Sequence, residues 1–289
     1  MKQTAVIGLG AMGAGIAGNL HRANALYGAW NRTPARGQAA ADQHGFMLAE
    51  NIATATQNAE LIITSVSADA DLIEVTQQLC PLLKPESIVL DTSTISSDTA
   101  RKVAQLYAAQ GIHFLDGPVS GGKEGAEKGS MVMMVGGDAA LLESLMPTLD
   151  VITSRVMHMG PVGAGQATKA VNQIMAAGIN HAVTEALAFG QNQGLPMDKV
   201  IDVVSGGAAG NWFLQHRGPS MCAETFEPGF RVALHHKDLK ICQNMLAQQG
   251  VSLPVIEMTL VHYERLMQAG FGDEDISALF RNKKALFEQ

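Results

Sequence analysis

Three glycines, Gly8, Gly10 and Gly13, stand in the segment VIGLGAMG, which follows an apolar run and opens an Ala-rich stretch. Between a strand and a helix, GxGxxG makes a tight turn that lets the backbone approach a pyrophosphate, with the helix N-terminus facing the anion. We therefore expect a dinucleotide along the turn formed by Gly8, Leu9, Gly10, Ala11, Met12 and Gly13. The alternative is a tight turn that binds no ligand.

A second segment, Asn31, Arg32 and Thr33, lies about 20 residues after the first glycine, at the end of the apolar run LYGAW. An NAD-specific site carries Asp or Glu at this place to bind the ribose hydroxyls, whereas a guanidinium binds a 2′-phosphate with charge-assisted hydrogen bonds. Residues 1–41 contain no Asp or Glu, which also favours an anion. The segment predicts NADP(H) as the cofactor; the alternative is that Arg32 is a solvated surface residue.

Two further segments, DTST at 91–94 and DGPVSGGKEGA at 116–126, each follow an apolar run. If those runs are parallel strands, the hydroxyl groups lie at the carboxyl edge of the sheet, where ligands bind. The exposed N–H groups of the second segment could hold a carboxylate. The alternatives are a helix N-cap for the first segment and a flexible glycine turn for the second.

The segment GAGQATKAVNQ at 163–173 places Lys169 and Asn172 three residues apart, on one face of a helix. Most helical lysines are simply solvated. Here the neighbours on the helix are nearly all small or apolar, so the amine is expected to face something other than bulk water.

The candidate site residues must be positioned by secondary-structure elements. Through the first half of the chain, short apolar runs alternate with Ala-rich amphipathic stretches. Alternating strands and helices predict parallel βαβ units in a doubly wound, mostly parallel α/β sheet of Rossmann type. The expected strands lie at 5–10, 26–30, 61–66, 87–93, 112–119, 131–137 and 155–160.

From residue 163 the pattern changes to 32 residues without proline or strand-like alternation, which predicts one long helix. After Gly194 only helix-like segments follow, each ended by Gly or opened by Pro. The chain is thus expected to contain a dinucleotide-binding domain (1–162), a connecting helix (163–193) and an all-helical C-terminal domain (194–289) with the substrate pocket and oligomer contacts.

Composition excludes several classes of protein. Hydrophobic residues make up 47% and charged residues 16%, and the net charge is −7, which is typical of a globular protein and argues against nucleic-acid binding. The apolar run at the start is too short for a membrane span or a signal sequence, so we expect a cytoplasmic protein without membrane association. Three cysteines without a CxxC pair indicate neither a disulfide framework nor a zinc site, and no metal is expected.

Five motifs in order, GLGAMGAGIAGNL, DTST, DGPVSGG, GAGQATKAVNQ and HHKDL, resemble those of the β-hydroxyacid dehydrogenase family over essentially the whole chain. That family includes 3-hydroxyisobutyrate dehydrogenase, tartronate semialdehyde reductase and the glyoxylate/succinic semialdehyde reductases. The resemblance implies a Rossmann-type domain and a helical domain joined by a long helix, with assembly into dimers or tetramers.

The resemblance also implies roles for single residues. Lys169 matches the catalytic lysine, which exchanges a proton with the substrate oxygen during hydride transfer, and Asn172 matches an asparagine that orients the substrate. Thr94 matches a residue beside the nicotinamide ribose, and Lys237 matches a lysine at the cofactor. The substrate carboxylate is expected at Ser120, Gly121 and Gly122, and Val66 is expected at the cofactor.

Departures from the family pattern bear on the shape of the pocket and on which substrate is expected. Gln173 replaces an asparagine of many relatives and Gly117 replaces an alanine, while the loop SGGKEGA is closer to the semialdehyde reductases. We expect NADPH-dependent reduction of a small aldehyde acid. The alternatives are a 3-hydroxyisobutyrate or other β-hydroxyacid dehydrogenase, an imine reductase, which normally lacks the lysine, and a cofactor-binding sensor without turnover. A 6-phosphogluconate dehydrogenase would carry a longer helical domain.

Three residues of the C-terminal half stay open at this point. Trp212 is expected to line the substrate pocket, with core packing as the alternative for it and for Phe213. Arg217 pairs either with a distal substrate carboxylate or with an acidic residue of a neighbouring helix.

Overall fold

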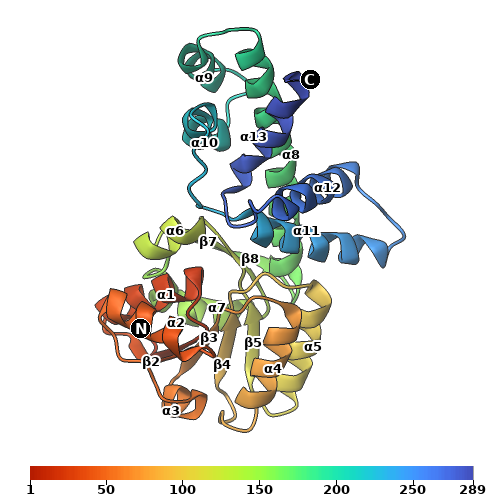
Figure 1. The fold of residues 1–289 in the computed structure, drawn as a ribbon. Helices are drawn as coiled ribbons and strands as arrows, with labels where there is room; N and C mark the ends of the chain where they lie inside the picture. Colours follow the sequence, from red (N-terminus) through yellow and green to blue (C-terminus); the bar gives the residue numbers. More distant parts are fainter. Residues whose placement is uncertain (289) are drawn as a thin grey trace. The chain divides into compact units, whose positions relative to one another are not determined.

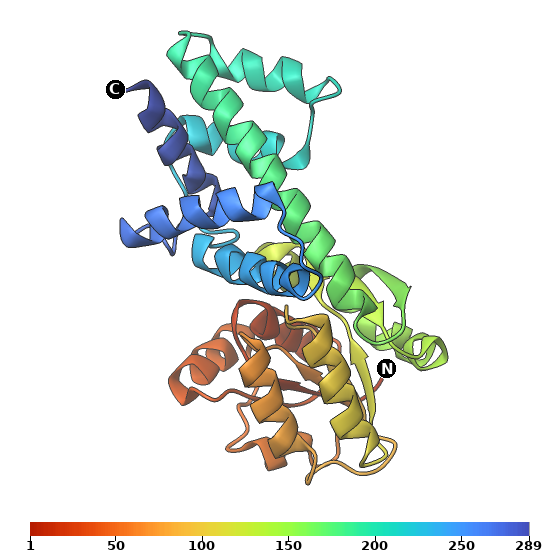
Figure 2. The same cartoon turned by 90° about the vertical axis from the view of Figure 1, so that its right-hand side faces the viewer.

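The computed structural model describes residues 1–288 and divides into two compact units, Met1–Lys169 and a second that starts at Ala170 (Figures 1 and 2). The helix α8 (Ala164–Asn192) begins in the first unit and continues through the second. Its 29 residues confirm the long uninterrupted helix that the sequence predicts after residue 163.

A sheet of eight strands forms the centre of the first unit, and most neighbouring strands are parallel. The strand order is β2-β1-β3-β4-β5-β7-β6, and β8 pairs with β7. Only the pairs that β7 makes with β5 and β6 are antiparallel. The strands are β1 (Thr4–Ile7), β2 (Leu26–Trp30), β3 (Leu61–Thr64), β4 (Ile88–Asp91), β5 (His113–Asp116), β6 (Val119–Ser120), β7 (Met131–Gly136) and β8 (Thr153–Gly160).

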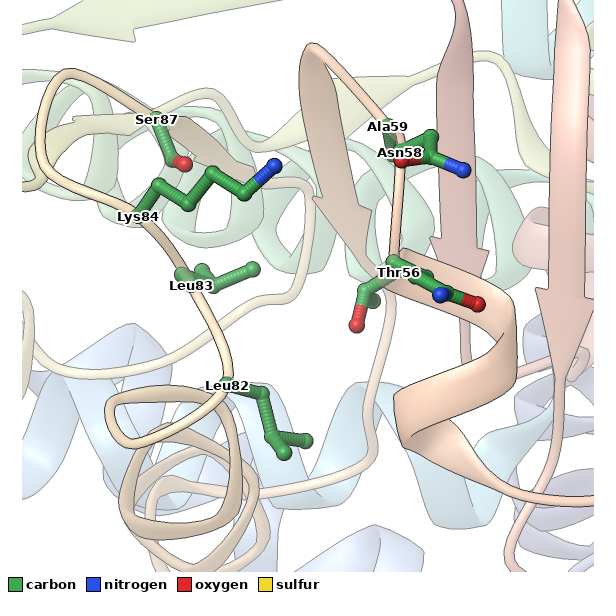
Figure 3. Close-up of a pocket in the computed structure, with 8 residues that line it drawn as sticks. Thr56, Asn58, Ala59, Leu82, Leu83, Lys84 and Ser87 are labelled. Carbon is green, nitrogen blue, oxygen red and sulfur yellow. The ribbon is translucent and has the colours of Figure 1, made fainter.

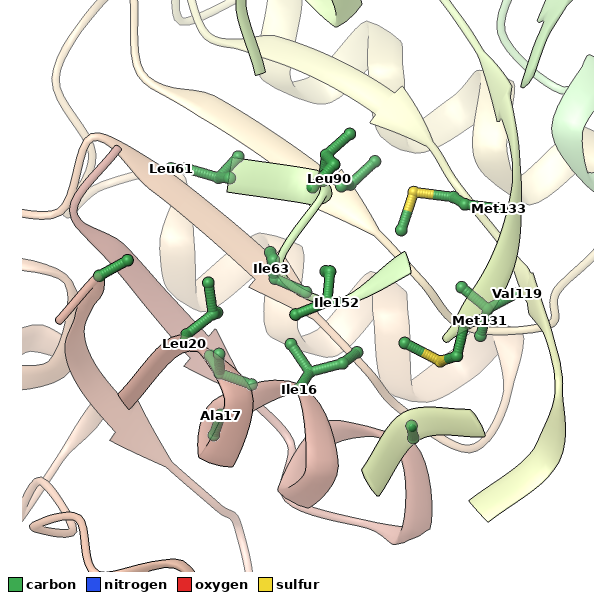
Figure 4. Packing of buried hydrophobic residues seen from close by; sticks show 14 of the residues in the cluster. Ile16, Ala17, Leu20, Leu61, Ile63, Leu90, Val119, Met131, Met133 and Ile152 are labelled. Carbon is green, nitrogen blue, oxygen red and sulfur yellow. The ribbon is translucent and has the colours of Figure 1, made fainter. Parts of the chain in front are cut away.

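Helices cover both faces of this sheet (Figure 1). Because side chains alternate along a strand, Val6 packs with α1 and α7 in one core, while Ile7 packs with α4 and α5 in the other. Figure 4 shows part of the first core, including Ile16, Ala17 and Leu20 of α1. The helices of this unit are α1 (Ala11–Arg22), α2 (Pro34–His44), α3 (Ile52–Thr56), α4 (Asp69–Leu79), α5 (Ser97–Ala108), α6 (Gly122–Lys128) and α7 (Ala139–Leu149).

The strand order reverses at β1, which has β2 on one side and β3 on the other. In open α/β sheets, ligands bind at the carboxyl ends of the strands on either side of such a switch point. The glycine turn follows β1, and the segments of 91–94 and 116–126 follow β4 and β5 at the same edge. The sheet therefore brings three of the predicted motifs to one edge.

One expected strand, 112–119, consists of two short strands in the structure. β5 ends at Asp116, and β6 begins at Val119 and pairs with β7 in the antiparallel direction. Pro118 lies between them and has no N–H to donate to a sheet. The chain therefore leaves β5 where the predicted carboxylate-binding loop begins.

Residues 170–288 form helices and no strand, which confirms the helical C-terminal part of the predicted fold. Their core includes the fully buried Tyr263 and Phe280. One of the helices of this unit contains Gly218 and Pro219, although both residues disfavour helix interiors. The helices after α8 are α9 (Met197–Ser205), α10 (Trp212–Cys222), α11 (Val232–Ala247), α12 (Pro254–Gln268), η1 (Ile276–Ala278), α13 (Leu279–Lys284) and η2 (Ala285–Phe287).

Candidate active site

The three glycines of the turn have different surroundings. Gly8 has φ +97°, and a Cβ at this position would collide with the carbonyl of Ser65 at the end of β3. A Cβ at Gly13 would collide with the carbonyl of Gly8, so Gly13 lets α1 pack against the strand. At Gly10, by contrast, no heavy atom lies within 4 Å of the place of a Cβ. The turn thus has two glycines packed inside and one facing open space.

The open side of the turn fits a phosphate group. Gly10 is the N-cap of α1 and offers no side chain to the first backbone N–H groups, and no acidic residue stands in the first turn of the helix. Uncapped N–H groups and the positive end of the helix dipole attract an anion. These residues fit the pyrophosphate of a dinucleotide.

Asn31 fixes this turn from the end of β2. Its Oδ1 accepts a hydrogen bond from the backbone N–H of Leu9 at 2.9 Å, and its Nδ2 donates to the carbonyl of Thr33 at 2.9 Å. The two predicted cofactor segments are therefore joined by one side chain. Asn31 acts on the shape of the site.

Arg32 lies at the surface with 63% of its side chain exposed, and it is paired with two carboxylates of α4. Its Nη1 donates to Asp71 at 2.7 Å and to Glu74 at 3.2 Å. The hydrogen bond and the charge of Asp71 raise the pKa of the guanidinium above its ordinary value. The absence of acid from residues 1–41 therefore did not predict the surroundings of Arg32, because α4 lies far along the chain.

The DTST segment is held by a network around Asp91, which is fully buried at the end of β4. Oδ1 of Asp91 accepts hydrogen bonds from Thr64 and Ser93, each at 2.7 Å. Ser93 Oγ in turn accepts from the backbone N–H of Val66 at 2.8 Å, which ties β4 to the loop after β3. Burial, together with the nearby charge of Asp116 and against the hydrogen bonds from Ser93 and Thr64, raises the pKa of Asp91 to about 6.

The alternative for DTST, a helix N-cap, is wrong in this structure. The N-cap of α5 is Ser96, whose Oγ accepts from the N–H of Thr99 at 3.1 Å. Thr94 is half-buried between the network and this cap. The segment therefore remains available for the predicted role of Thr94 at the cofactor.

The start of α8 is held by Asp116, which the sequence analysis left without a role. Its carboxylate accepts hydrogen bonds from the backbone N–H groups of Gly163 at 2.7 Å and Gln166 at 2.9 Å. Burial raises the pKa of Asp116, and these hydrogen bonds oppose the shift. The side chain of Gln166 also bonds to the carbonyl of Ser93 and the N–H of Ile95. One signal was available in the sequence: Asp91 and Asp116 each stand directly at the end of a buried strand.

Lys169 is buried, with 7% of its surface exposed, and its Nζ donates a hydrogen bond to the carbonyl of Val119 at 2.9 Å. Val119 directly precedes Ser120, Gly121 and Gly122, the loop predicted to hold the substrate carboxylate. The structure thus brings the predicted proton donor next to the predicted carboxylate loop. The alternative of a solvated lysine does not hold.

In the second unit, a chain of polar contacts connects Asn172 with Lys237. Asn172 Nδ2 donates to Gln173 Oε1 at 2.7 Å, and Gln173 Nε2 donates to Asp238 Oδ2 at 2.7 Å. Lys237 pairs with the same carboxylate at 2.8 Å. Gln173, noted in the sequence only as a departure, is 1% exposed and holds this chain together.

Three further residues of α10 have distinct surroundings. Phe213 is buried in the core of the second unit, whereas Trp212 is 59% exposed and stacks on His216 with ring centroids 4.3 Å apart. Arg217 pairs with the buried carboxylate of Asp275 at 3.4 Å, so the salt bridge between elements of the chain is the interpretation that the structure supports.

A hollow between loops lies at the edge of the sheet opposite to the glycine turn (Figure 3). Its walls come from residues 56–59 before β3 and 82–87 before β4, and thus from the amino ends of the strands. It holds none of the predicted site residues. Among residues 1–288 no cluster of His, Cys, Asp or Glu forms a metal site, and no helix is long and apolar enough to cross a membrane.

Comparisons with known proteins agree with this arrangement. Residues 3–160 match the model of the NAD-binding domain of 6-phosphogluconate dehydrogenase, and residues 163–282 match the model described as NAD-binding of NADP-dependent 3-hydroxyisobutyrate dehydrogenase. The chain belongs to the β-hydroxyacid dehydrogenase family. As a member it is an NAD(P)-dependent oxidoreductase that acts on CH–OH groups of small hydroxyacids.

Individual relatives of this β-hydroxyacid dehydrogenase carry different names. An uncharacterized oxidoreductase of Shewanella frigidimarina is 35% identical (96% of this chain, 97% of the relative), and an NAD-dependent L-serine dehydrogenase of Pseudomonas aeruginosa is 32% identical (96% and 97%). Glyoxylate/succinic semialdehyde reductase 1 of Arabidopsis thaliana is 28% identical (96% and 97%). The solved structure of Mycobacterium tuberculosis 3-hydroxyisobutyrate dehydrogenase with L-serine superimposes with a TM-score of 0.88 at 30% identity (98% and 99%).

Proposed function

We propose that this β-hydroxyacid dehydrogenase reduces a small aldehyde acid of the glyoxylate, succinic semialdehyde or tartronate semialdehyde type to its hydroxyacid with NADPH, in a reversible reaction. The observation that carries the proposal is the buried amine of Lys169 on the carbonyl of Val119, beside the loop of Ser120, Gly121 and Gly122. A substrate whose carboxylate binds to that loop would have its aldehyde group near the amine of Lys169, which can donate a proton.

The chemistry of the chain follows from these groups. The reduced nicotinamide cofactor, when bound, supplies the hydride. Lys169, as an ammonium, donates a proton to the carbonyl oxygen as negative charge develops there, and the neutral amine takes that proton back in the oxidation. Val119 accepts from the ammonium and so orients it. Asp116 accepts hydrogen bonds from backbone N–H groups at the start of the helix that carries Lys169, and the side chain of Gln166 donates to Ser93, so both fix this helix.

The choice of NADPH rests on Arg32, which stands where a carboxylate would bind the ribose of NAD. A guanidinium there binds a 2′-phosphate. Thr94, Val66, Asn172 and Lys237 keep the roles expected for them from the family resemblance, and Trp212 keeps its expected place at the substrate pocket.

A second candidate is a dehydrogenase for a β-hydroxyacid of the 3-hydroxyisobutyrate or serine type. The specific observation in its favour is that two of the relatives carry the names L-serine dehydrogenase and 3-hydroxyisobutyrate dehydrogenase, the latter in a structure with L-serine. The loop SGGKEGA favours the aldehyde acids. Both candidates use Lys169 in the same way.

The test follows absorbance at 340 nm with purified protein. NADPH and NADH are offered with glyoxylate, succinic semialdehyde, tartronate semialdehyde and methylmalonate semialdehyde, and NADP⁺ and NAD⁺ with 3-hydroxyisobutyrate and L-serine. We expect the highest kcat/KM with NADPH and one of the first three aldehydes. Turnover confined to the two hydroxyacids, or to methylmalonate semialdehyde, would replace the proposal with the second candidate.

A further inference from the structure

Arg32 donates hydrogen bonds to two carboxylates of α4, and this pairing bears on how strongly the chain distinguishes NADP from NAD. Asp71 stands in the first turn of α4 with 21% of its side chain exposed, and Glu74 stands one turn later with 52% exposed. Both reach the same nitrogen, Nη1 of Arg32. The three side chains form what we call the Arg32 cluster.

The Arg32 cluster carries one positive and two negative charges. An isolated guanidinium at this place would attract a 2′-phosphate, but the cluster as a whole has a net charge of −1. A phosphate dianion that approaches Arg32 must displace or share the two carboxylates and is repelled by them. The 2′-hydroxyl of NAD carries no charge and does not meet this repulsion.

We propose that Asp71 and Glu74 are specificity-determining residues, which weaken the preference for NADP over NAD by competing with the 2′-phosphate for Arg32. The inference rests on the proposed role of Arg32 in binding NADP. Asp71 has the larger effect of the two, because it is closer to Nη1 and less exposed to solvent. The chain therefore combines a residue that selects NADP with two that limit the selection.

The test measures dissociation constants of NADP⁺ and NAD⁺ by isothermal titration calorimetry, which needs no substrate. The variants D71N, E74Q and D71N/E74Q change the cluster charge from −1 to 0, 0 and +1 with little change in shape. Since exposed ion pairs are individually weak, we expect NADP⁺ to bind about fivefold more tightly to D71N, about twofold to E74Q and at least tenfold to the double variant. The Kd of NAD⁺ is expected to change less than twofold.

Two controls identify the cause. E86Q removes a surface carboxylate that pairs with His113 and lies just before β4, at the amino ends of the strands. This variant is expected to change neither the Kd of NADP⁺ nor the Kd of NAD⁺. In the background R32A, D71N is expected to lose most of its effect on NADP⁺, because no guanidinium remains to compete for. An undiminished effect in that background would contradict competition.

The outcomes separate this inference from the proposed function. If R32A weakens NADP⁺ binding but D71N and E74Q leave it unchanged or weaken it, the carboxylates do not compete and the inference is wrong while the role of Arg32 stands. If R32A changes neither constant, the role of Arg32 and the inference both fail. An equal gain for NADP⁺ and NAD⁺ in D71N would also contradict the inference.

Discussion

Asp91 and Asp116 lie buried at the ends of two neighbouring strands, whereas Asp71 and Glu74 lie at the surface beside Arg32. The buried pair accepts hydrogen bonds from fixed hydroxyl and backbone N–H groups. The surface pair holds one flexible side chain that is mostly exposed. The same kind of group thus stands in two very different environments of one unit.

This difference indicates which substitutions should lower the stability of the fold and which should not. A buried polar group that loses its partner costs about 1 to 3 kcal/mol, because its desolvation is no longer compensated. An exposed ion pair contributes less than about 1 kcal/mol. The residues that position Lys169 are therefore expensive to alter, while the charge beside Arg32 changes at little cost in stability.

The largest effect on the free energy of unfolding is expected at Asp91. Its pKa is about 6 in the folded protein and 3.8 when unperturbed, so the folded state holds this proton more tightly than the unfolded chain. The stability from this group is complete below pH 3.8 and is lost as pH rises through 6, a loss of about 3 kcal/mol.

The variant D91N imitates the neutral form at every pH and should remove this loss. Urea denaturation of wild type and D91N is compared between pH 4 and pH 8. The stability of D91N relative to wild type is expected to rise over this range and then level off. A difference that does not depend on pH would show that Asp91 titrates normally and would weaken the contrast between the two regions.

The next effect is expected for D116N. An asparagine keeps the size of the side chain but turns an amide NH₂ toward one of the two backbone N–H groups that the carboxylate now binds. We expect the free energy of unfolding to fall by about 2 kcal/mol and kcat to fall while the Kd of NADP⁺ stays within threefold. Unchanged stability and kcat would mean that Asp116 does not hold α8.

The smallest effect is expected for R32A. Loss of the guanidinium should weaken NADP⁺ binding about tenfold and leave the thermal unfolding temperature within about 1 °C of wild type. Calorimetric titration and thermal melting measure both. A large fall in the unfolding temperature of R32A would show that the Arg32 cluster is structural. The contrast between the buried carboxylates and those beside Arg32 would then no longer hold.

Much of this fold could be predicted from the sequence, because the signals are local. The glycine turn, the alternation of strands with helices and the long helix after residue 163 each follow from short stretches of chain. The placement of Lys169 away from bulk water also followed from its small and apolar helical neighbours. The helix with Gly218 and Pro219 lies within the region that was expected to be helical, although its local propensities oppose a helix.

What could not be predicted depends on partners far apart in the chain. Asp71 lies 39 residues after Arg32, and the bond from Gln166 to Ser93 spans 73 residues. The place of Asp116 at the end of a buried strand marks it as a candidate, but the sequence around it does not identify its partner, the first turn of α8. Such pairs arise only when the strands are placed in order in the sheet.

The most direct test of the account is the kcat of K169M, measured at 340 nm with NADPH and the best aldehyde acid of the substrate panel. Methionine keeps the length of the side chain and removes the proton donor, and general acid catalysis contributes about 10²- to 10⁴-fold. We predict that kcat falls about 1,000-fold while the Kd of NADP⁺ and the unfolding temperature stay close to wild type. A kcat within tenfold of wild type would contradict the assignment of Lys169 as the general acid.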